Sequence, residues 1–181
     1  GLSGGIDSAV VARLCQMAMP GMCLGVIMPC HSNPEDEAEA RVVADPYNVT
    51  TMAVPPEAPF VRLTSLVDGA FAATPGLRPH ATDDPKARVP PANVKPRLRM
   101  TTLYFVANRL NYLVAGTGNR SEITIGYYTK HGDGGVDLLP IGDLVKSEVR
   151  ELARELGVPA PIIDKPPGAG LWGGQAGAGE K

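Results

Sequence analysis

Apolar residues fall into short blocks along the chain, and these blocks alternate between the patterns of strands and helices. Residues 22–28 (MCLGVIM) and 49–54 (VTTMAV) are brief apolar runs, which are typical of strands covered on both faces. Residues 111–115 (NYLVA) predict a third strand. Helical composition occupies the intervening blocks, which are 8–19, 35–44, 63–73 and 98–110. This alternation predicts an α/β fold, with a parallel sheet and helices on both of its faces.

The clearest amphipathic pattern follows Asp143, which we expect to cap a helix. Apolar residues recur at helical spacing at positions 145, 149, 152, 153 and 156, and Gly157 and Pro159 end the pattern. Three other segments lack such a pattern. Residues 74–96 hold six prolines and predict a mobile loop. Residues 126–143 are glycine-rich and suit an active-site loop, and residues 166–181 are rich in glycine and alanine and suit a loose tail or lid.

Composition narrows the class of protein without identifying it. The 181 residues, 44% of them hydrophobic, suit one compact domain. A net charge of −2 argues against general binding to nucleic acid or to an anionic membrane. Apolar runs stay shorter than the roughly 18 residues of a membrane span. Three cysteines without a CxxC pair, and no charged-then-apolar leader, predict a cytoplasmic protein with reduced thiols.

Two segments rich in glycine and in polar or acidic residues follow predicted strands or begin helices. They are 1–8 (GLSGGIDS) and 116–122 (GTGNRSE), and in a parallel sheet both are expected at the carboxyl ends of the strands, facing one cleft. The glycines leave backbone N–H groups free to meet an anion at the start of a helix, and Ser3 and Ser8 add donors. Asp7 suits an anion site only if a divalent cation is shared there. A simple glycine-rich turn capped by Asp7 or Ser8 is the structural alternative.

The SGGIDS segment resembles the pyrophosphate loop of ATP pyrophosphatases, which adenylate their substrates. Three further stretches narrow the resemblance to the NAD synthetase family: residues 116–146 (GTGNRSEITIGYYTKHGDGGVDLLPIGDLVK), 93–100 (NVKPRLRM) and 165–175 (KPPGAGLWGGQ). Four motifs in the right order cover nearly the whole chain. The resemblance implies a Rossmann-like, adenine nucleotide alpha-hydrolase-like fold of three layers, in a single domain over 1–181.

The resemblance also implies a reaction. A ligase of this family converts deamido-NAD, ATP and ammonia to NAD, AMP and pyrophosphate through an acyl adenylate. The cofactors implied are ATP and Mg²⁺, and family members are homodimers. Ammonia could be free or could come from a glutaminase domain or subunit upstream, and the sequence leaves both open.

Residue roles follow from matching motifs. The ATP-binding set comprises Gly1, Leu2, Ser3, Gly4, Gly5, Ile6, Asp7, Ser8, Thr117 and Lys146. Asp7 and Glu122 match the magnesium ligands, and Arg97, Lys130 and Asp137 match the positions that bind deamido-NAD. Asp133 matches the aspartate at the reacting carboxylate and ammonia, so Asp133 and Lys146 are the expected catalytic residues. Lys146 lies at a helix start, where a cation is mildly unfavourable, which supports an anionic partner for it.

The chain also departs from the family pattern. A strand and a helix precede the pyrophosphate loop in the family, so residues are expected to be missing before Gly1. Gly168 replaces a hydroxyl residue that meets ATP, which predicts weaker ATP binding by about 0.5–1.5 kcal/mol. Two alternatives remain: another adenylating amidotransferase, such as a GMP-synthetase-like enzyme, and a nucleotide-binding module without turnover. The GYYTKHGDGG segment argues against the former.

Overall fold

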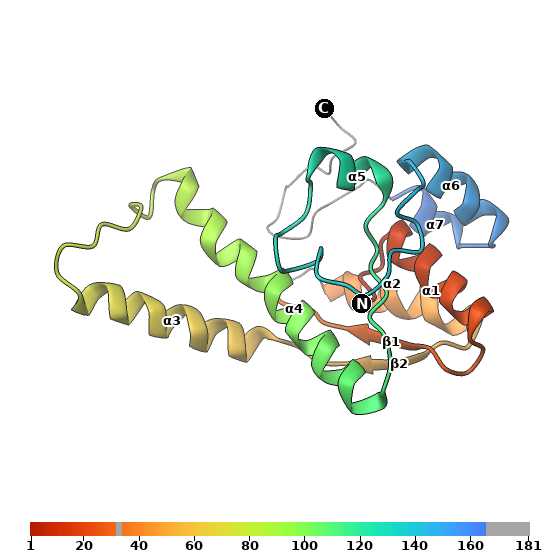
Figure 1. The fold of residues 1–181 in the computed structure, drawn as a ribbon, viewed down its shortest axis with the longest axis horizontal. Coiled ribbons are helices and arrows are strands. Elements are labelled where there is room, and N and C mark those ends of the chain that lie inside the picture. Colours follow the sequence, from red (N-terminus) through yellow and green to blue (C-terminus); the bar gives the residue numbers. More distant parts are fainter. Residues whose placement is uncertain (32–33, 166–181) are drawn as a thin grey trace.

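A pair of parallel strands forms the centre of the molecule. The computed structural model describes residues 1–31 and 34–165 (Figure 1). Strand β1 (Leu24–Ile27) pairs in parallel with β2 (Thr50–Ala53), with Leu24 opposite Thr50 and Ile27 opposite Ala53. Leu2 adds a parallel bridge to Ile27, and its N–H donates to the carbonyl of Val26 at 2.9 Å. The segment that enters the glycine loop therefore runs alongside β1.

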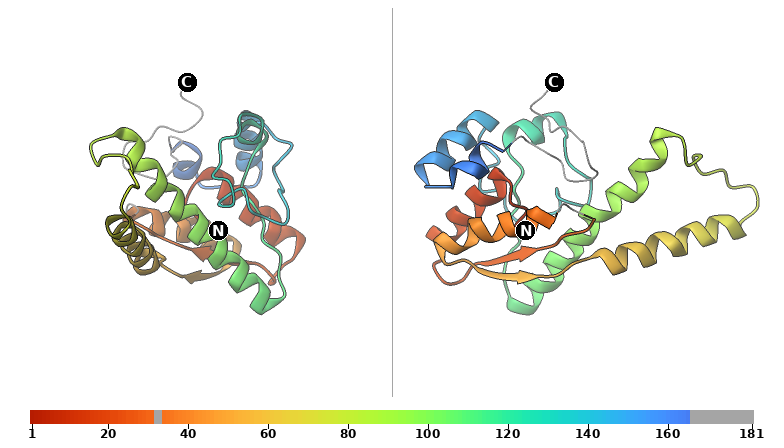
Figure 2. Two further views of the ribbon diagram at one scale, coloured as in Figure 1. Left: turned by 60° about the vertical axis from the view of Figure 1, so that its left-hand side comes forward. Right: turned by 180° about the vertical axis from the view of Figure 1, so that it is seen from behind.

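Helices surround these strands. In chain order they are α1 (Ile6–Ala18), α2 (Pro34–Ala44), the 3-10 turn η1 (Asp45–Tyr47), α3 (Glu57–Ala73), the 3-10 turn η2 (Pro85–Arg88), α4 (Val89–Leu110), α5 (Arg120–Ile125), α6 (Lys146–Glu155) and α7 (Ala160–Ile163). Helices α1 and α2 lie on one side of the strands, with α6 and α7 packed against α1, while α4 crosses the other side (Figures 1 and 2). This arrangement confirms the predicted three-layered, Rossmann-like α/β class.

The hydrophobic core lies where α1 meets α6 and α2. Val10, Val43, Ile141 and Val149 are fully buried in it. Helix α3 and the start of α4 extend away from this core as an arm (Figure 1), and none of the residues of α3 is buried. The apolar surface that folding hides is thus concentrated around the first turn of α1, which stabilises the position of the glycine loop.

The predicted strand at 111–115 is wrong. The described segment is extended, but its pairing is limited to one parallel bridge between Ala115 and Leu138. The carbonyl of Val114 accepts from the N–H of Asp137 at 3.0 Å, so the neighbour of this segment is a loop rather than a strand. An apolar run alone does not establish a ladder, because the ladder needs a partner of matching length.

The predicted loop at 74–96 is wrong at its carboxyl end. Helix α4 already begins at Val89, with Pro90 and Pro91 in its first turn, and Pro96 lies inside it. First-turn residues have no intrahelical acceptor for their N–H groups, so prolines are tolerated there. Pro90 and Pro91 therefore mark a helix start rather than a loop. Mobility of the remaining residues stays a prediction.

Asp143 does not cap α6, because the helix begins at Lys146 and the N-cap position is Val145. The side chain of Glu148 accepts from the Val145 N–H at 2.8 Å and satisfies this end of the helix. Residues 166–181, including the predicted lid and Gly168, lie outside the described residues. Within the described part of the chain, no helix is both long and apolar enough to cross a membrane.

Candidate active site

The glycine loop is held by two serine hydroxyls at the start of α1. Ser8 Oγ donates to the carbonyl of Gly5 at 2.8 Å and lies 3.2 Å from Ser3 Oγ, which accepts from the Gly5 N–H at 3.3 Å. Gly4 has φ +76°, and a Cβ there would lie 2.8 Å from Cβ of Glu39 on α2. Only glycine combines this left-handed backbone with such close approach to a neighbouring helix. The loop is thus a tight turn packed against α2, with Ser3 at its exposed side.

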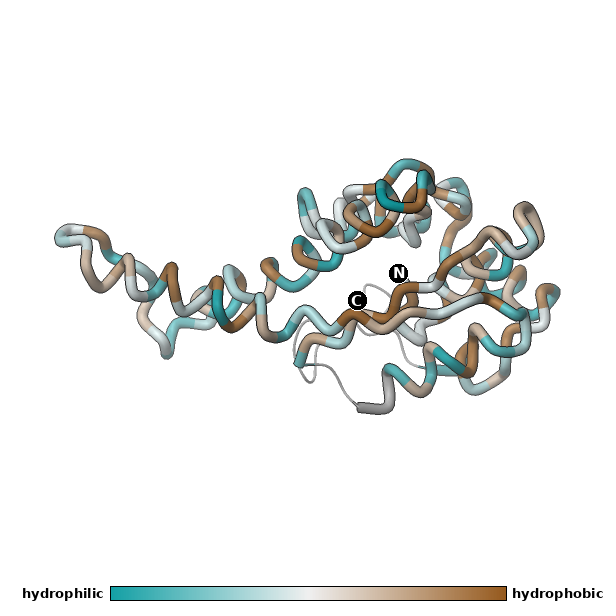
Figure 3. Tube along the Cα trace, turned by 90° about the horizontal axis from the view of Figure 1, so that it is seen from below, coloured by the Kyte–Doolittle hydropathy of each residue, from teal (hydrophilic) through white to brown (hydrophobic). Residues whose placement is uncertain are grey.

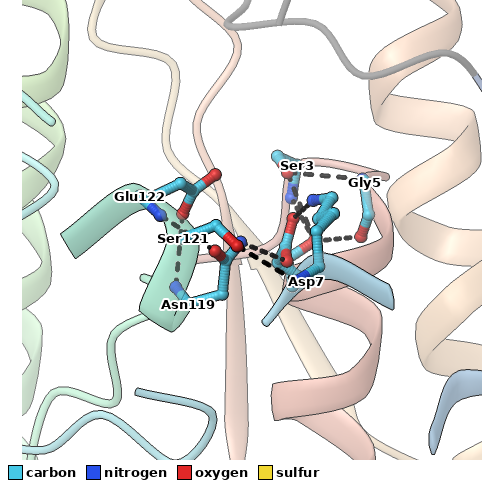
Figure 4. Close-up of polar contacts among 8 residues, drawn as sticks. Ser3, Gly5, Asp7, Asn119, Ser121 and Glu122 are labelled. Atoms are coloured by element: carbon cyan, nitrogen blue, oxygen red, sulfur yellow. Dashed lines mark hydrogen bonds and ion pairs between the residues drawn. The ribbon is translucent and has the colours of Figure 1, made fainter. Parts of the chain in front are cut away.

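Asn119 connects the glycine loop to helix α5. Its Nδ2 donates to Asp7 Oδ1 at 3.1 Å, and its Oδ1 accepts from the Glu122 N–H at 3.0 Å. Glu122 Oε2 accepts in return from the Asn119 N–H at 3.3 Å, which completes a capping box. Figure 4 shows Glu122 on α5 and Asn119 just before this helix, with contacts reaching Asp7 on α1. Two carboxylates that are far apart in the sequence are therefore both held by Asn119.

Lys146 brings a positive charge to the same place. Its Nζ forms an ion pair with Asp7 Oδ2, and its backbone N–H donates to Ser121 Oγ at 3.2 Å. The side chains of Lys146 and Asp7 are 23% and 19% exposed, so the pair is largely shielded and yet reachable from solvent. The starts of α1, α5 and α6 thus converge.

Burial and the crowding of acidic groups in this cluster both affect the pKa of Glu122. Burial raises the pKa of this carboxyl, and the neighbouring charge of Asp7 raises the pKa further. Asp133 acts in the same direction, while a backbone hydrogen bond and Lys146 oppose the rise. Acidic groups crowded in this way disfavour their own charged forms and favour a cation between them.

A second group of predicted residues lies on the loop that follows α5. Asp133 Oδ1 accepts from the Thr129 N–H at 2.9 Å, and Thr129 Oγ1 lies 3.1 Å from Asn93 Oδ1 on α4. Arg97 Nε donates to the Lys130 carbonyl at 3.2 Å, so α4 holds this turn from two sides. The influence of Asp133 on Glu122 connects the turn to the carboxylate pair.

Asp137 is engaged within the protein. Its Oδ2 accepts from the Val114 N–H at 2.7 Å, and its Oδ1 accepts from Tyr104 Oη–H at 3.0 Å. The sequence matched it to the substrate site, whereas these contacts connect the 114–115 segment to α4. A binding role for Asp137 stays a prediction beside this structural one.

The structure thus brings together the predicted residues Ser3, Asp7, Ser8, Glu122 and Lys146, and it places Arg97, Lys130 and Asp133 around a neighbouring turn. Thr117 lies half-buried between the Ala115 bridge and Asn119. Sequence reasoning did not single out Asn119, although it is fully buried. Its signal was present, because Asn119 and Glu122 have the N-x-x-E spacing of a capping box.

The donor set fits a hard divalent cation that is shared with phosphate oxygens. Asp7 and Glu122 offer carboxylate oxygens of the type that Mg²⁺ prefers. No cluster of three or more His, Cys, Asp or Glu side chains suited to a metal occurs among the described residues. Proteins commonly hold Mg²⁺ through one or two carboxylates, while substrate phosphates and waters supply the remaining ligands.

A parallel α/β domain with a glycine loop at a helix start, an acidic pair and a lysine has the features of nucleotide-phosphate-binding proteins. Comparison with known proteins makes the class specific. The family model for NAD synthase matches residues 1–180. The chain therefore belongs to the NAD synthase family, a family of ligases that form a C–N bond.

Individual relatives agree with this membership. The chain is 56% identical over 180 residues to the NH(3)-dependent NAD(+) synthetase of Carboxydothermus hydrogenoformans, covering 99% of this chain and 70% of that protein. Among solved structures, the NMN synthetase from Francisella tularensis matches with a TM-score of 0.83 and 35% identity, covering 97% of this chain and 68% of that one. The glutamine-dependent NAD+ synthetase from Acinetobacter baumannii, in complex with ADP, matches with a TM-score of 0.77 and 26% identity, covering 91% of this chain and 31% of that one.

Proposed function

We propose that this chain catalyses the ATP-dependent amidation of deamido-NAD by ammonia, giving NAD, AMP and pyrophosphate. The observation that carries the proposal is the convergence of the glycine loop, the Asp7–Glu122 carboxylates and Lys146 at the starts of three helices. The identity to ammonia-dependent relatives supports the assignment.

The adenylation step requires that the phosphate charge of ATP is neutralised and that the reacting groups are held in position. A carboxylate oxygen of the nicotinate attacks the α-phosphorus of ATP, the bond to the β-phosphate oxygen breaks, and pyrophosphate leaves with its electrons. Backbone N–H groups of residues 1–8, the start of α1 and the ammonium of Lys146 would stabilise the charge that develops. The helix start alone is insufficient, because Asp7 contributes a negative charge there.

Magnesium is the component that reconciles Asp7 with an anionic substrate. Asp7 and Glu122 would hold the ion, and when bound it supplies charge neutralisation for the phosphates. The raised pKa of Glu122 supports this placement, since a nearby cation favours the ionised carboxylate that burial and Asp7 disfavour.

The amidation step needs an uncharged nitrogen nucleophile. Ammonia attacks the carbonyl carbon of the acyl adenylate, the bond to the AMP oxygen breaks, and the nitrogen loses a proton. Asp133 would orient the ammonia and accept that proton. Its carboxylate is fixed by the Thr129 N–H and remains exposed at the surface of the turn. Arg97 and Lys130 meet at the same turn and are proposed to bind deamido-NAD together with Asp137. Thr117 is proposed to contact ATP, as the family pattern suggests.

Ammonia is the proposed nitrogen donor because relatives at 56% and 41% identity are named as NH(3)-dependent. A glutaminase domain or subunit, which the sequence left open, has no support from them. The match to an NMN synthetase makes the mononucleotide an acceptor worth testing beside the dinucleotide.

A homodimer is proposed on the basis of the arm formed by α3 and the start of α4. Exposed apolar side chains are frequent on this arm, which Figure 3 shows as hydrophobic segments among polar ones. They include Val61, Leu66, Val67, Phe71 and Val89, each at least 40% exposed. A 17-residue helix with no buried residue is rarely stable by itself in water. A second copy of the chain would cover it, so Leu66→Lys should shift the sedimentation of the protein from dimer to monomer.

The decisive assay supplies ATP, Mg²⁺ and ammonium with deamido-NAD, with its mononucleotide counterpart, or with xanthosine monophosphate. Formation of NAD and AMP in equal amounts with deamido-NAD is the expected result. AMP formed only with xanthosine monophosphate would instead indicate the GMP-synthetase-like alternative. Retained ATP binding without AMP from any acceptor would indicate a binding module without turnover.

A further inference from the structure

Asn119 is one of three buried polar or charged residues among the described parts of the chain, and its side chain is fully buried. A buried amide normally needs partners for both of its ends. Here its acceptor end meets α5, and its donor end meets α1. The residue therefore spans the two elements that carry the acidic pair.

The contact divides the two oxygens of Asp7 between different partners. Oδ1 accepts from Asn119 Nδ2, and Oδ2 faces the ammonium of Lys146. A carboxylate held at one oxygen cannot rotate freely about its χ2 bond, so the other oxygen keeps a fixed direction. That direction is toward a positive charge.

We propose that Asn119 is a positioning residue, which fixes the orientation of Asp7 relative to Glu122 so that Asp7 Oδ2 is presented to the cation bound with ATP. The inference rests on the proposed metal site. It goes beyond that proposal because it assigns the relative orientation of Asp7 and Glu122 to the buried amide of Asn119. The side chain of Asn119 is fully buried. It acts through Asp7 and through the first turn of α5.

Two substitutions separate this role from helix capping. Asn119→Ser keeps a good N-cap residue for α5 but is too short to reach Asp7. Asn119→Ala removes the cap as well. Thr124→Ala is the matched control, because Thr124 Oγ1 donates only to the Arg120 carbonyl at 2.7 Å on the same helix.

The primary measurement is the affinity for Mn²⁺ in the presence of ATP, with neither acceptor nor ammonia added. Electron paramagnetic resonance of the Mn²⁺ ion detects the binding. Asn119→Ser is expected to weaken Mn²⁺ binding by about 10- to 100-fold, the range seen when partners that orient metal ligands are removed. Asn119→Ala should behave similarly, and Thr124→Ala should match the wild type. In steady-state assays, Asn119→Ser should raise KM for Mg·ATP more than it lowers kcat.

The outcome that overturns the proposal is wild-type Mn²⁺ binding by Asn119→Ser with a defect confined to Asn119→Ala, which would leave capping as the whole role. In an Asp7→Asn background, Asn119→Ser should add no further loss, and an additive loss would contradict action through Asp7. If Asp7→Asn itself leaves Mn²⁺ binding unchanged, the metal site and this inference fall together. Failure of the NAD-forming assay alone leaves these binding results intact, so the two proposals can fail separately.

A second measurement applies if Asn119→Ser does not fold. In ¹⁵N-labelled protein, the Asn119 side-chain amide resonance should move on Asp7→Ala and stay in place on Thr124→Ala. An unmoved resonance in Asp7→Ala would refute the contact on which the proposal stands.

Discussion

Lys146 and Asp7 form an ion pair although they are 139 positions apart in the chain. Lys146 is the first residue of α6, and Asp7 lies in the first turn of α1. Both helix starts carry the positive end of the backbone dipole, so a carboxylate is favoured there and a lysine is not. The pair therefore places an ammonium where only a strong anionic partner stabilises it.

Replacing Lys146 should separate cation binding from catalysis. Lys146→Met removes the ammonium that competes with a metal ion for Asp7, so Mn²⁺ binding without ATP should strengthen by roughly three- to tenfold, a modest gain because the pair is partly exposed. The same change should lower kcat/KM for NAD formation by about 10²–10³, because a charge that stabilises the leaving phosphates is lost. Lys86→Met, an exposed change on η2, is the control for charge alone.

Metal titration and steady-state kinetics on the same preparations test this prediction. Weaker Mn²⁺ binding by Lys146→Met would mean that Lys146 supports Asp7 rather than competing for it. Unchanged kinetics would remove Lys146 from the catalytic residues.

Glu122→Gln should stabilise the metal-free protein. The pKa of Glu122 is raised in the folded state, chiefly by burial and then by Asp7. The folded protein therefore binds this proton more readily than the unfolded chain does, and the stability it contributes declines as the pH rises from the ordinary glutamate range through the raised pKa. Glutamine keeps an oxygen for the Asn119 N–H and carries no charge, so it should add about 0.5–2 kcal/mol at neutral pH.

Urea unfolding in EDTA, at neutral pH and near pH 4, measures this effect. The gain should be large at neutral pH and should shrink in acid, where the wild-type carboxyl is protonated. A gain that is equal at both pH values would contradict the electrostatic origin. The same variant should bind Mn²⁺ less tightly than the wild type, so stability and metal affinity move in opposite directions.

The sequence predicted the parts of the site that lie within motifs, and it missed the contacts between them. Asp7 stood out within the glycine loop, whereas the roles of Glu122 and Lys146 came from the resemblance of their motifs to the NAD synthetase family. The role of Asn119 depends on a contact between residues 112 positions apart, which no local pattern contains. The two fold errors have different causes. The run at 111–115 lacks a strand partner, and the prolines of 90 and 91 were taken for a loop although they open α4.

Glycine at position 4 should be required for more than its backbone conformation. Gly4 and Gly126 both have positive φ, at +76° and +69°, but a Cβ at Gly126 would meet no atom within 4 Å. Gly126→Ala should therefore cost only the left-handed strain of about 1–2 kcal/mol. Gly4→Ala adds a clash with Glu39, so it should destabilise the protein more and should also weaken ATP binding.

Thermal unfolding and ATP titration of the two variants decide the matter. Equal losses of stability in the two variants would show that α2 can move away from a Cβ at position 4, so that the close approach at Gly4 is unimportant. Loss of ATP affinity in Gly126→Ala of the same size would show that the loop is not specifically affected.

Substitutions of Asp137 and Tyr104 test whether Asp137 only supports the fold or also binds substrate. Asp137→Ala should destabilise the protein by about 1–3 kcal/mol, because it leaves the N–H of the buried Val114 without its carboxylate acceptor. Tyr104→Phe removes only the hydroxyl contact to Oδ1 and should cost about 0.5–1.5 kcal/mol. If Asp137 also binds deamido-NAD, Asp137→Ala should raise KM for that substrate at a temperature where the variant is fully folded, whereas Tyr104→Phe should leave the KM unchanged. An unchanged KM in Asp137→Ala, beside a lowered midpoint of unfolding, would confine Asp137 to holding the 114–115 segment against α4.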